Sequence, residues 1–482
     1  MSPSPSARWI RQTEPRLIRP HFCHSPGLCD NISDTAMSEK KKKKTINVGI
    51  LGFGTVGSGT ARILVENAAL LKERLGFPVA LRKIADLDIK RDRGIKLGRD
   101  VLTTDAKEVT DNPGIDIVVE LIGGLGAARQ LMLRAIENGK SVVTANKALL
   151  AETGSGIFAA ARKRGVSVGF EASVGGGIPI IKALGEGLVA NRINHVYGIV
   201  NGTSNYILTK MTDGAMEFPD ALAEAQALGY AEANPALDVG GADSAHKLTI
   251  LASLAFGIPL SYKHVYTEGI TDITRQDITF AGELGFKIKL LAIAKARDGR
   301  VELRVHPTML PKGYLISQVD GVMNAIYVNG KETGDTLYYG RGAGDMPTGS
   351  AVVSDIAGIA ERIVSGARHK AGPVEVSSPM GICPMEDVQS MYYFRFAALD
   401  RPGVLSKISG ILGSNDISIA SVIQRDRRDG EAVPLVVLTH KAKEKNVRRA
   451  LKKIDSLPVV AAQSRLIRVE GAGQAGGNQK SL

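Results

Sequence analysis

Residues 45–75 read TINVGILGFGTVGSGTARILVENAALLKERL, and this stretch decides the fold of the N-terminal part of the chain. The apolar run Ile46–Leu51 predicts a buried strand, and a long helix is expected to follow through about Leu75. Between them lies the pattern GxGxxG, formed by Gly52, Phe53, Gly54, Thr55, Val56 and Gly57. Its three glycines suit a tight turn, a close approach of a pyrophosphate, and close helix–strand packing. We therefore predict a dinucleotide-binding turn, against the alternative of a purely structural glycine-rich turn.

Strand and helix signals continue to alternate beyond this turn. They fall at Val79–Ala85, Ile115–Leu121, Gln130–Asn138 and Ser141–Thr144. Such alternation predicts an α/β fold in which helices cover both faces of a parallel sheet. The first domain is thus expected to be Rossmann-like.

The length of 482 residues predicts about three domains. The expected organisation is an N-terminal extension at 1–44, a Rossmann-like domain at 45–170 whose sheet is completed by about 340–372, an α+β substrate-binding and dimerisation domain at 171–340, a proline-rich linker at 373–390, a small domain at 391–470, and a disordered tail at 471–482. The small domain shows a strand–helix–strand–strand–helix–strand pattern.

Composition excludes several classes of protein. Three cysteines are too few and too scattered for a disulfide framework or a zinc site. No apolar stretch approaches the ~18–20 residues of a membrane span. The net charge of +12 is concentrated in residues 1–44 and 391–470, so the remainder is close to neutral and gives no reason to expect nucleic acid.

The first 36 residues are rich in Ser, Pro and Arg and have no apolar periodicity. A transit peptide would be arginine-rich and poor in acids. However, Glu14, Asp30 and Asp34 are acidic residues that such a peptide would lack. Met37 is a plausible start of translation. We interpret the segment as an over-extended or disordered terminus and expect a cytoplasmic protein.

The end of the second strand bears on which dinucleotide is bound. An acidic residue there would hold the ribose of NAD, whereas an arginine would hold the 2′-phosphate of NADP. Asp86 ends the strand, and Lys90, Arg91 and Arg93 follow it. Both signals are present, and we favour NADP, with Arg91 as a contact and NAD tolerated.

Lys147 follows the strand Ser141–Thr144 and should face the ligand crevice at the carboxyl edge of the sheet. A solvated surface lysine is the alternative, and the two interpretations have about equal weight. Further on, four ionisable residues fall within sixteen positions: Glu232, Asp238, Asp243 and Lys247. Asp243 and Lys247 are separated by four positions at the start of an apolar helix, so both project from one face.

A lysine held by carboxylates can donate a proton to an oxygen that gains negative charge, as carbonyl reduction requires. An ordinary salt bridge is the alternative for Asp243 and Lys247. The sequence has no histidine and cysteine cluster with metal-ligand spacing, and neither GxxxxGK[ST] nor GxSxG occurs. Nucleotide hydrolysis and serine esterase chemistry therefore lack support.

Over nearly all of residues 45–470 the chain resembles homoserine dehydrogenases that carry a C-terminal ACT domain. The matching blocks are GILGFGTVG (49–57), TANKALLA (144–151), EASVGGGIPII (171–181), NGTSNYIL (201–208), AQALGYAEANPALDVGGADSAHKL (225–248) and GRGAGDMPTGSAVVSD (340–355). The resemblance implies reversible reduction of L-aspartate 4-semialdehyde to L-homoserine with NAD(P)H, in threonine, methionine and isoleucine biosynthesis. The short N-terminus leaves no room for an aspartate-kinase module, so the monofunctional form is expected.

The resemblance also implies residue roles. Lys247 matches the proton donor, Lys147 matches a lysine between cofactor and substrate, and Asp243 is expected to be a third catalytic residue. Substrate binding is implied for Glu232, Asp238, Asp243, Thr203 and Lys147, and cofactor contacts for Phe53, Thr55, Val56, Gly229 and Gly349. A monovalent cation, usually sodium, would be held mostly by backbone carbonyls at Glu171, Val174, Gly176 and Ile178.

The C-terminal region resembles an ACT domain, a regulatory βαββαβ unit. Its first turn holds Asp400, Pro402, Gly403 and Val404, where proline suits a first helical turn and glycine lets a ligand approach free amides. Threonine as feedback inhibitor is the hypothesis, and a dimerisation module without a ligand is the alternative. The resemblance implies a homodimer or homotetramer.

Two other functions are alternatives to the homoserine dehydrogenase function. A dehydrogenase for another small aldehyde would be indicated by replacement of Glu232 or Asp243, and both are present. A non-catalytic sensor would tolerate loss of Lys147 and Lys247, and both are present.

Overall fold

A computed structural model describes residues 45–471 of the chain, except 99, 374–379 and 425–429. The predictions for residues 1–44 and 471–482 lie outside the described residues, except at Gly471. Six parallel strands form the first sheet in the order β3-β2-β1-β4-β5-β6. They are β1 (Ile46–Leu51), β2 (Val79–Ala85), β3 (Leu102–Thr103), β4 (Ile117–Glu120), β5 (Ser141–Thr144) and β6 (Val168–Gly169). The predicted parallel α/β sheet is confirmed.

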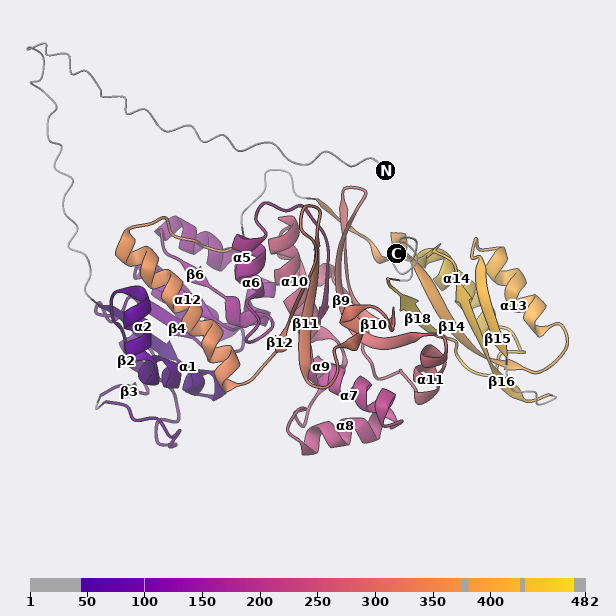
Figure 1. The fold of residues 1–482 in the computed structure, drawn as a ribbon, viewed down its shortest axis with the longest axis horizontal. Helices are drawn as coiled ribbons and strands as arrows, with labels where there is room; N and C mark the ends of the chain where they lie inside the picture. Colours follow the sequence, from indigo (N-terminus) through magenta and orange to yellow (C-terminus); the bar gives the residue numbers. More distant parts are fainter. Residues whose placement is uncertain (1–44, 99, 374–379, 425–429, 472–482) are drawn as a thin grey trace, which may run out of the picture. The chain divides into compact units, whose positions relative to one another are not determined.

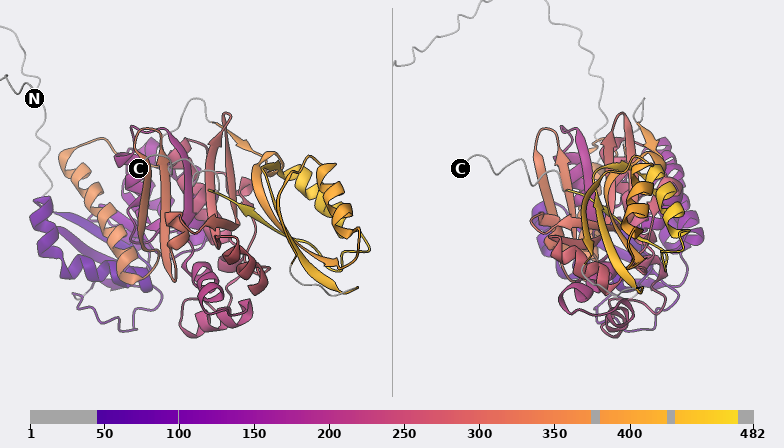
Figure 2. Two further views of the ribbon diagram at one scale, coloured as in Figure 1. Left: turned by 45° about the vertical axis from the view of Figure 1, so that its right-hand side comes forward. Right: turned by 90° about the vertical axis from the view of Figure 1, so that its right-hand side faces the viewer.

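Helices cover both faces of this sheet because the strands are apolar on both sides. One face packs on α1 (Thr55–Glu66) and α12 (Asp345–Ser365), and the other on α4 (Gly126–Glu137) and α5 (Lys147–Arg164). Figure 2 shows α12, in orange, beside the indigo helix α1. The remaining helices of this region are α2 (Ala68–Leu75) and α3 (Lys107–Thr110).

Two expectations about this domain were wrong in detail. The single helix expected through Leu75 is broken at Asn67 into α1 and α2. Residues 340–372 were expected to complete the sheet, but they contribute helix α12 and only an isolated parallel bridge between Ala371 and Val168. The long segment returns to the domain because α12 offers an apolar face to α1, a contact that no local pattern encodes.

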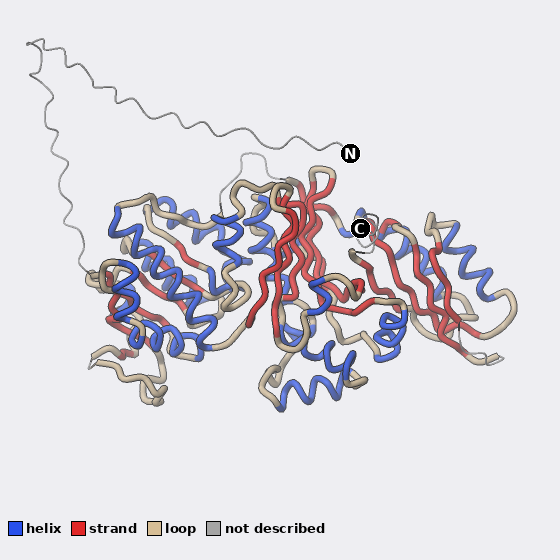
Figure 3. Tube along the Cα trace, in the orientation of Figure 1, coloured by secondary structure: helices blue, strands red, loops and turns tan. Residues whose placement is uncertain are grey.

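The middle of the chain forms a mixed sheet backed by helices. Its strands run β12-β11-β7-β9-β10, and they appear in red near the centre of Figure 3. The strands are β7 (Ile193–Ile199), β8 (Tyr266–Thr267), β9 (Phe286–Arg297), β10 (Arg300–Pro311), β11 (Met323–Gly330) and β12 (Gly334–Arg341). The helices are α6 (Ile180–Lys182), α7 (Gly202–Asp213), α8 (Phe218–Ala227), α9 (Ala236–Val239), α10 (Ala242–Phe256) and α11 (Arg275–Glu283), with shorter turns at Glu171–Ser173, Ala183–Gly187, Tyr262–His264 and Leu315–Gln318. As predicted, α10 is apolar and buried.

The C-terminal region has the predicted βαββαβ order (Figure 1). It consists of β14 (Gln389–Leu399), α13 (Val404–Gly413), β15 (Ile419–Gln424), β16 (Ala432–Thr439), the short β17 (Ala442–Lys443), α14 (Glu444–Asp455) and β18 (Arg465–Val469). Its sheet is continuous with the mixed sheet of the middle region. Strand β18 pairs in parallel with β10 at Thr308 and Met309, so one sheet continues through both domains.

The predicted linker at 373–390 is partly structured. Strand β13 (Gly381–Cys383) pairs with the first residues of β10, and a short turn at Met385–Asp387 leads into β14. The three prolines and the lack of periodicity predict a linker, but none of the prolines lies within Gly381–Cys383, so these three residues are free to pair. Among the described residues, no helix is both long and apolar enough to cross a membrane.

Candidate active site

The glycine turn between β1 and α1 has the geometry that its sequence predicts. Gly52 has φ +97°, and a Cβ there would lie 2.7 Å from the Leu121 backbone. A Cβ on Gly57 would lie 2.1 Å from the carbonyl oxygen of Gly52. Gly54, in contrast, has open space around its missing Cβ. The protein itself requires the first and third glycines, whereas the second leaves room for a ligand.

At the end of β2, the Asp86 carboxylate is held within the protein. It accepts hydrogen bonds from the Phe53 amide at 2.5 Å and the Asp88 amide at 2.8 Å. Arg93 donates to the Phe53 carbonyl, lies 4.5 Å from the Phe53 ring centre, and approaches Asp86 to 3.8 Å. Arg91 is exposed and contributes backbone contacts to the same loop. The guanidinium beside the glycine turn is therefore that of Arg93.

A cavity of about 380 Å³ lies at the carboxyl edge of the parallel sheet, next to this turn. It is lined by Val56, Glu120, Leu121, Gly123, Gly124, Ala145, Asn146, Lys147, Ala148, Glu232, Asn234, Leu237, Asp238, Asp243 and His246. Crevices at this edge are where open α/β sheets bind ligands. The cavity brings the predicted cofactor turn and the predicted acidic cluster together.

One carboxylate bridges the two lysines in this region. Asp243 Oδ2 lies 2.6 Å from Lys247 Nζ, and Asp243 Oδ1 lies 3.2 Å from Lys147 Nζ. Lys247 also donates to the carbonyl of Val200 at 2.5 Å. Burial lowers the pKa of Lys247, while Asp243 opposes that change. Burial would raise the pKa of Asp243, but the two lysines outweigh it and hold that pKa well below its usual range.

The two lysines differ in their access to solvent. The side chain of Lys147 is 41% exposed, whereas that of Lys247 is 11% exposed. Lys147 begins α5 directly after the cap residue Asn146, whose side chain accepts from the Leu149 amide. Lys247 lies one turn into α10. The carboxylate between them thus connects a buried ammonium group to a solvent-accessible one.

Asn201 is a residue of this site that the sequence analysis missed. Its side-chain amide donates to Asp238 at 2.7 Å and to Asp243 at 2.9 Å, and its oxygen caps α7 by accepting from Ser204. Burial raises the pKa of Asp238, which Asn201 partly offsets. The signal available was the asparagine immediately before the helix that begins at Gly202, a usual capping position.

Of the other predicted substrate residues, Glu232 lines the cavity and is exposed, whereas Thr203 lies outside the cavity lining. Thr203 donates to the carbonyl of Tyr230 at 2.5 Å, which ties α7 to the loop that carries Glu232. His246, expected as a plain helix-face residue, is buried, stacks on Tyr262 with ring centres 4.2 Å apart, and also lines the cavity.

Two of the predicted cofactor contacts have structural roles outside the cavity lining. Gly229 follows the end of α8 with φ +75°, a conformation that favours glycine. Gly349 lies in α12, where a Cβ would approach the backbone of Gly59 and Thr60 to 2.8 Å. It permits α12 to cross α1 closely.

The predicted cation loop begins at a buried glutamate. The Glu171 carboxylate accepts from the amides of Ile181 at 2.8 Å and Lys182 at 2.9 Å, and its own amide donates to Asp355 at 2.7 Å. Burial and Asp355 raise the pKa of Glu171 to about 7. This carboxylate is therefore engaged within the protein, so any cation here would meet backbone carbonyls. The described residues contain no cluster of His, Cys, Asp and Glu that could hold a metal ion.

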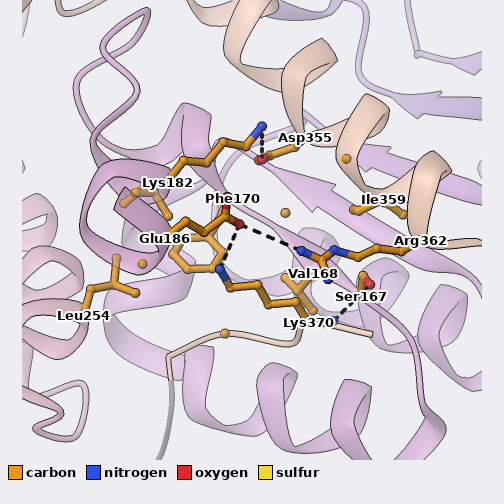
Figure 4. Close-up of a pocket in the computed structure, with 15 residues that line it drawn as sticks. Ser167, Val168, Phe170, Lys182, Glu186, Leu254, Asp355, Ile359, Arg362 and Lys370 are labelled. Atoms are coloured by element: carbon orange, nitrogen blue, oxygen red, sulfur yellow. Dashed lines mark hydrogen bonds and ion pairs between the residues drawn. The ribbon is translucent and has the colours of Figure 1, made fainter. Parts of the chain in front are cut away.

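A second cavity, of about 80 Å³, adjoins this loop (Figure 4). Its cationic side chains already have anionic partners: Lys182 lies 3.8 Å from Asp355, and Lys370 lies 3.0 Å from Glu186. Figure 4 shows these pairs meeting across the cavity. The cavity carries none of the groups predicted to bind substrate, so the active site is assigned to the larger cavity.

In the C-terminal domain, the predicted regulatory turn precedes α13. Gly403 caps the helix with φ +86° and Val404 is its first residue. Pro402 therefore lies outside the helix, not in its first turn as expected. Asp400 accepts from Gln424 at 3.2 Å.

The fold and site define the class: a nicotinamide-dependent oxidoreductase with a Rossmann-like domain, a mixed-sheet catalytic domain and an ACT domain. Family models agree, matching "Homoserine dehydrogenase, NAD binding domain" at 52–171, "Homoserine dehydrogenase" at 179–357 and "ACT domain" at 392–458. The chain belongs to the homoserine dehydrogenase family.

Individual relatives support this assignment. Homoserine dehydrogenases of Pseudomonas aeruginosa and Neisseria gonorrhoeae are 48% and 46% identical, each over 89% of this chain and 99% of the relative. A crystal structure of a homoserine dehydrogenase from Thiobacillus denitrificans superposes with a TM-score of 0.84 at 49% identity, over 89% of this chain and 98% of that one. A hyperthermophilic archaeal homoserine dehydrogenase in complex with NADPH covers 65% of this chain and 96% of its own, with a TM-score of 0.55 and 26% identity.

Proposed function

We propose that the chain catalyses reversible, NAD(P)H-dependent reduction of L-aspartate 4-semialdehyde to L-homoserine, with Lys247 as the proton donor. The observation that carries the proposal is the Lys147–Asp243–Lys247 bridge beside the glycine turn. Bound NAD(P)H would supply the hydride that carbonyl reduction requires. A proton must reach the aldehyde oxygen at the same time, and a charged lysine in a buried setting is suited to donate it.

The proton that Lys247 loses must be replaced. Lys247 is buried, but Asp243 contacts it with one oxygen and contacts the more exposed Lys147 with the other. We propose that Lys147 restores the proton through Asp243. In the reverse direction, the same path would carry the proton of the hydroxyl group away.

The substrate carries an ammonium group, and the cavity wall offers carboxylates to it. Glu232, Asp238 and Asp243 lie on that wall, and we propose that Glu232 with Asp243 holds the ammonium group. Glu232 is free to turn toward a ligand because it is exposed, and Asn201 holds both Asp238 and Asp243 in place on the wall. Thr203 positions the Glu232 loop.

NADP is the proposed preferred cofactor, with NAD tolerated. Two observations support this preference: Asp86, the group that would hold an NAD ribose, is already engaged by backbone amides, and Arg93 lies beside it. Arg91 is exposed in the same loop and is the second candidate for the 2′-phosphate.

A monovalent cation, with sodium the first candidate, would be held by the carbonyls of Glu171, Val174, Gly176 and Ile178. A hard cation suits oxygen ligands. The loop fits such a role because Gly175 and Gly176 both have positive φ angles, which turn successive carbonyls. The bound cation would hold this loop, between the two domains, in one conformation.

We further propose feedback control by threonine through the ACT domain, in the biosynthesis of threonine, methionine and isoleucine. The turn Asp400–Val404 remains a candidate effector contact, since the missing Cβ of Gly403 leaves open space. A homodimer or homotetramer is the proposed assembly. Threonine addition that leaves the activity unchanged would contradict the feedback proposal.

The test compares wild type and Lys247→Ala for oxidation of NADPH and NADH with aspartate 4-semialdehyde. Wild type should turn over, and the variant should lose ~10²-fold or more of kcat. Lys263→Ala, which removes an exposed lysine, is the matched control and should retain activity. Equal rates in wild type and Lys247→Ala would remove Lys247 from its role. Inactive wild type that still binds NADPH would indicate another aldehyde or a sensor.

A further inference from the structure

Glu120 is a fully buried acid beside the active-site cavity, and neither proton transfer nor substrate binding as proposed above uses it. It is the last residue of β4, is 0% exposed, and lines the cavity. In the part of the chain that the structure describes, no lysine, arginine or histidine forms an ion pair with its carboxylate. Glutamates are almost never fully buried without such a partner, because a buried charge is costly.

Three hydrogen bonds hold the carboxylate in place of a counter-ion. Oε1 accepts from the amides of Ile122 at 2.9 Å and Gly123 at 3.0 Å, and Oε2 accepts from the Thr144 hydroxyl at 2.6 Å. Amides can only donate, so these oxygens act as acceptors, as those of an ionised carboxylate do. Because the side chain has no exposed surface, it acts on a ligand in the cavity through its charge and not through a direct hydrogen bond.

The same hydrogen bonds connect two loops at the carboxyl edge of the sheet. Thr144 ends β5, and its hydroxyl also accepts from the Asn146 amide at 3.0 Å. The Asn146 side chain donates to the Gly124 carbonyl at 2.7 Å. The loop after β4 and the loop that carries Lys147 are thus held together around Glu120. The negative charge therefore has a fixed position and needs no rearrangement when charge develops in the cavity.

The order of the strands indicates which half of a dinucleotide would lie near Glu120. In a sheet of the order β3-β2-β1-β4-β5-β6, a dinucleotide lies across the carboxyl ends of the strands where the order reverses, between β1 and β4. The pyrophosphate belongs at the glycine turn after β1, and the adenosine half at the end of β2, beside Asp86 and Arg93. The nicotinamide half then belongs on the side of β4 and β5, where Glu120 and Lys147 lie.

Two glycines next to Glu120 leave room for that half. Gly123 and Gly124 line the cavity, have φ +80° and +72°, and would have nothing within 4 Å of an added Cβ. Gly54, in the turn after β1, has the same open space. Since the Gly123 amide donates to Glu120, the buried charge lies directly beneath a loop that a ligand can approach closely.

The two redox forms of the cofactor differ in charge at the nicotinamide ring, which is cationic when oxidised and neutral when reduced. We propose that the fixed charge of Glu120 favours the oxidised ring and so promotes hydride transfer to the aldehyde. The hydride carries two electrons to the carbonyl carbon, the oxygen takes a proton from Lys247, and the ring is left with a positive charge. A preorganised carboxylate stabilises that charge as it develops.

The test measures the dissociation constants of NADP⁺ and NADPH for the full chain without substrate, by calorimetry and by NADPH fluorescence. Glu120→Gln removes the charge and keeps the size of the side chain and an acceptor for the two amides. It should weaken binding of NADP⁺ relative to NADPH by roughly 10-fold, because charges interact strongly in a site of low dielectric constant. In the same variant kcat for aldehyde reduction should fall, with little change in KM for the aldehyde.

Three further variants separate the charge from the loop that it holds. Glu120→Asp keeps the charge, and Thr144→Val keeps it while removing one hydrogen bond. Both should leave the ratio of the two dissociation constants close to that of wild type, even where the affinity for both forms falls. Glu137→Gln is the matched control, since it removes an exposed acid of α4 outside the cavity lining, and it should leave the ratio unchanged.

The proposal is overturned if Glu120→Gln keeps the wild-type ratio, or if Glu120→Asp or Glu137→Gln changes the ratio as much as Glu120→Gln does. Should Glu120→Gln fail to fold, Glu120→Asp decides, because an altered ratio in a variant that keeps the charge would also overturn it. This inference rests on the proposed function only for its kinetic readout. Wild type that binds both forms but does not reduce the aldehyde would contradict the proposed function, and the ratio would still decide the role of Glu120.

Discussion

At the residue scale, the chemistry of the site depends on one carboxylate shared by two lysines. Asp243 is 8% exposed and lies between Lys147 and Lys247. A buried ammonium group without a counter-ion would lose its proton, because burial disfavours the charged form. Asp243 therefore favours the charged form of Lys247, the form that its proposed role as proton donor requires.

Asp243→Asn is expected to move the alkaline limb of the kcat–pH profile to lower pH. The pKa of Lys247 is already lowered by burial, and Asp243 is the main group that raises it. Its removal lowers that pKa further, so the proton donor is lost at a lower pH. The measurement is kcat for aldehyde reduction across the neutral and alkaline range.

Asp320→Asn is the control for this prediction. Asp320 also bridges two lysines, Lys287 at 3.0 Å and Lys289 at 2.7 Å, but it lies outside the cavity lining. Its loss should leave the alkaline limb in place. An unshifted limb in Asp243→Asn would show that Lys247 is not the titrating acid.

At the scale of elements, the cofactor domain depends on a close crossing of two helices distant in sequence. Helix α12 returns to pack on α1, and glycines on both sides permit the approach. A Cβ on Gly59 would lie 2.2 Å from the Asp345 carbonyl oxygen, and one on Gly349 would lie 2.8 Å from the Gly59 carbonyl carbon. Because the obstructing atoms are backbone, they cannot move aside as a flexible side chain could.

Gly349→Ala should therefore reduce the free energy of unfolding by about 1–3 kcal/mol, the usual cost of overpacking. The matched control is Gly358→Ala in the same helix, where a Cβ meets nothing within 4 Å. That change should stabilise the protein by roughly 0.5–1 kcal/mol, since alanine is the better helix former. Urea denaturation of both variants measures the difference, and equal effects would contradict the crossing argument.

At the scale of the whole molecule, the ACT domain is joined to the catalytic sheet through β18. The residue after this strand, Glu470, contacts three catalytic-domain groups: Arg304 at 2.5 Å, Tyr197 at 3.1 Å and Lys295 at 3.3 Å. Arg304 is fully buried, so it depends on its partners for compensation of its charge. The ACT domain and the catalytic domain are thus expected to unfold together.

Glu470→Ala should lower the free energy of unfolding by about 3–5 kcal/mol, because it leaves a buried guanidinium short of a partner. Asp387→Ala is the control: Asp387 pairs with the half-exposed Arg300 at 3.0 Å, so its loss should cost no more than about 1 kcal/mol. Similar losses in both variants would refute this role for Glu470.

The effect of Glu470 should also depend on pH. Burial would raise its pKa, but Arg304 and Lys295 outweigh burial and lower it from 4.5 to about 2. A carboxylate whose pKa is lower in the folded than in the unfolded protein stabilises the fold at any pH above its unfolded-state pKa. This stabilisation is lost as the pH falls to the folded-state pKa. The difference between wild type and Glu470→Ala should therefore shrink between about pH 4.5 and pH 2, as measured by acid unfolding.

What the sequence determined by itself was local. The glycine turn, the strands at Val79–Ala85 and Ser141–Thr144, and the i, i+4 placement of Asp243 and Lys247 follow from short-range geometry, and the structure has them. Matching blocks also identified the family.

Which distant residues meet depends on how the elements pack together. This packing brought Lys147 to Asp243 across nearly a hundred residues of chain, placed Asn201 between two acids, set Gly349 against α1, and paired β18 with β10. None of these contacts has a periodic signature, because long-range contacts form between surfaces whose complementarity appears only once the elements have folded and packed.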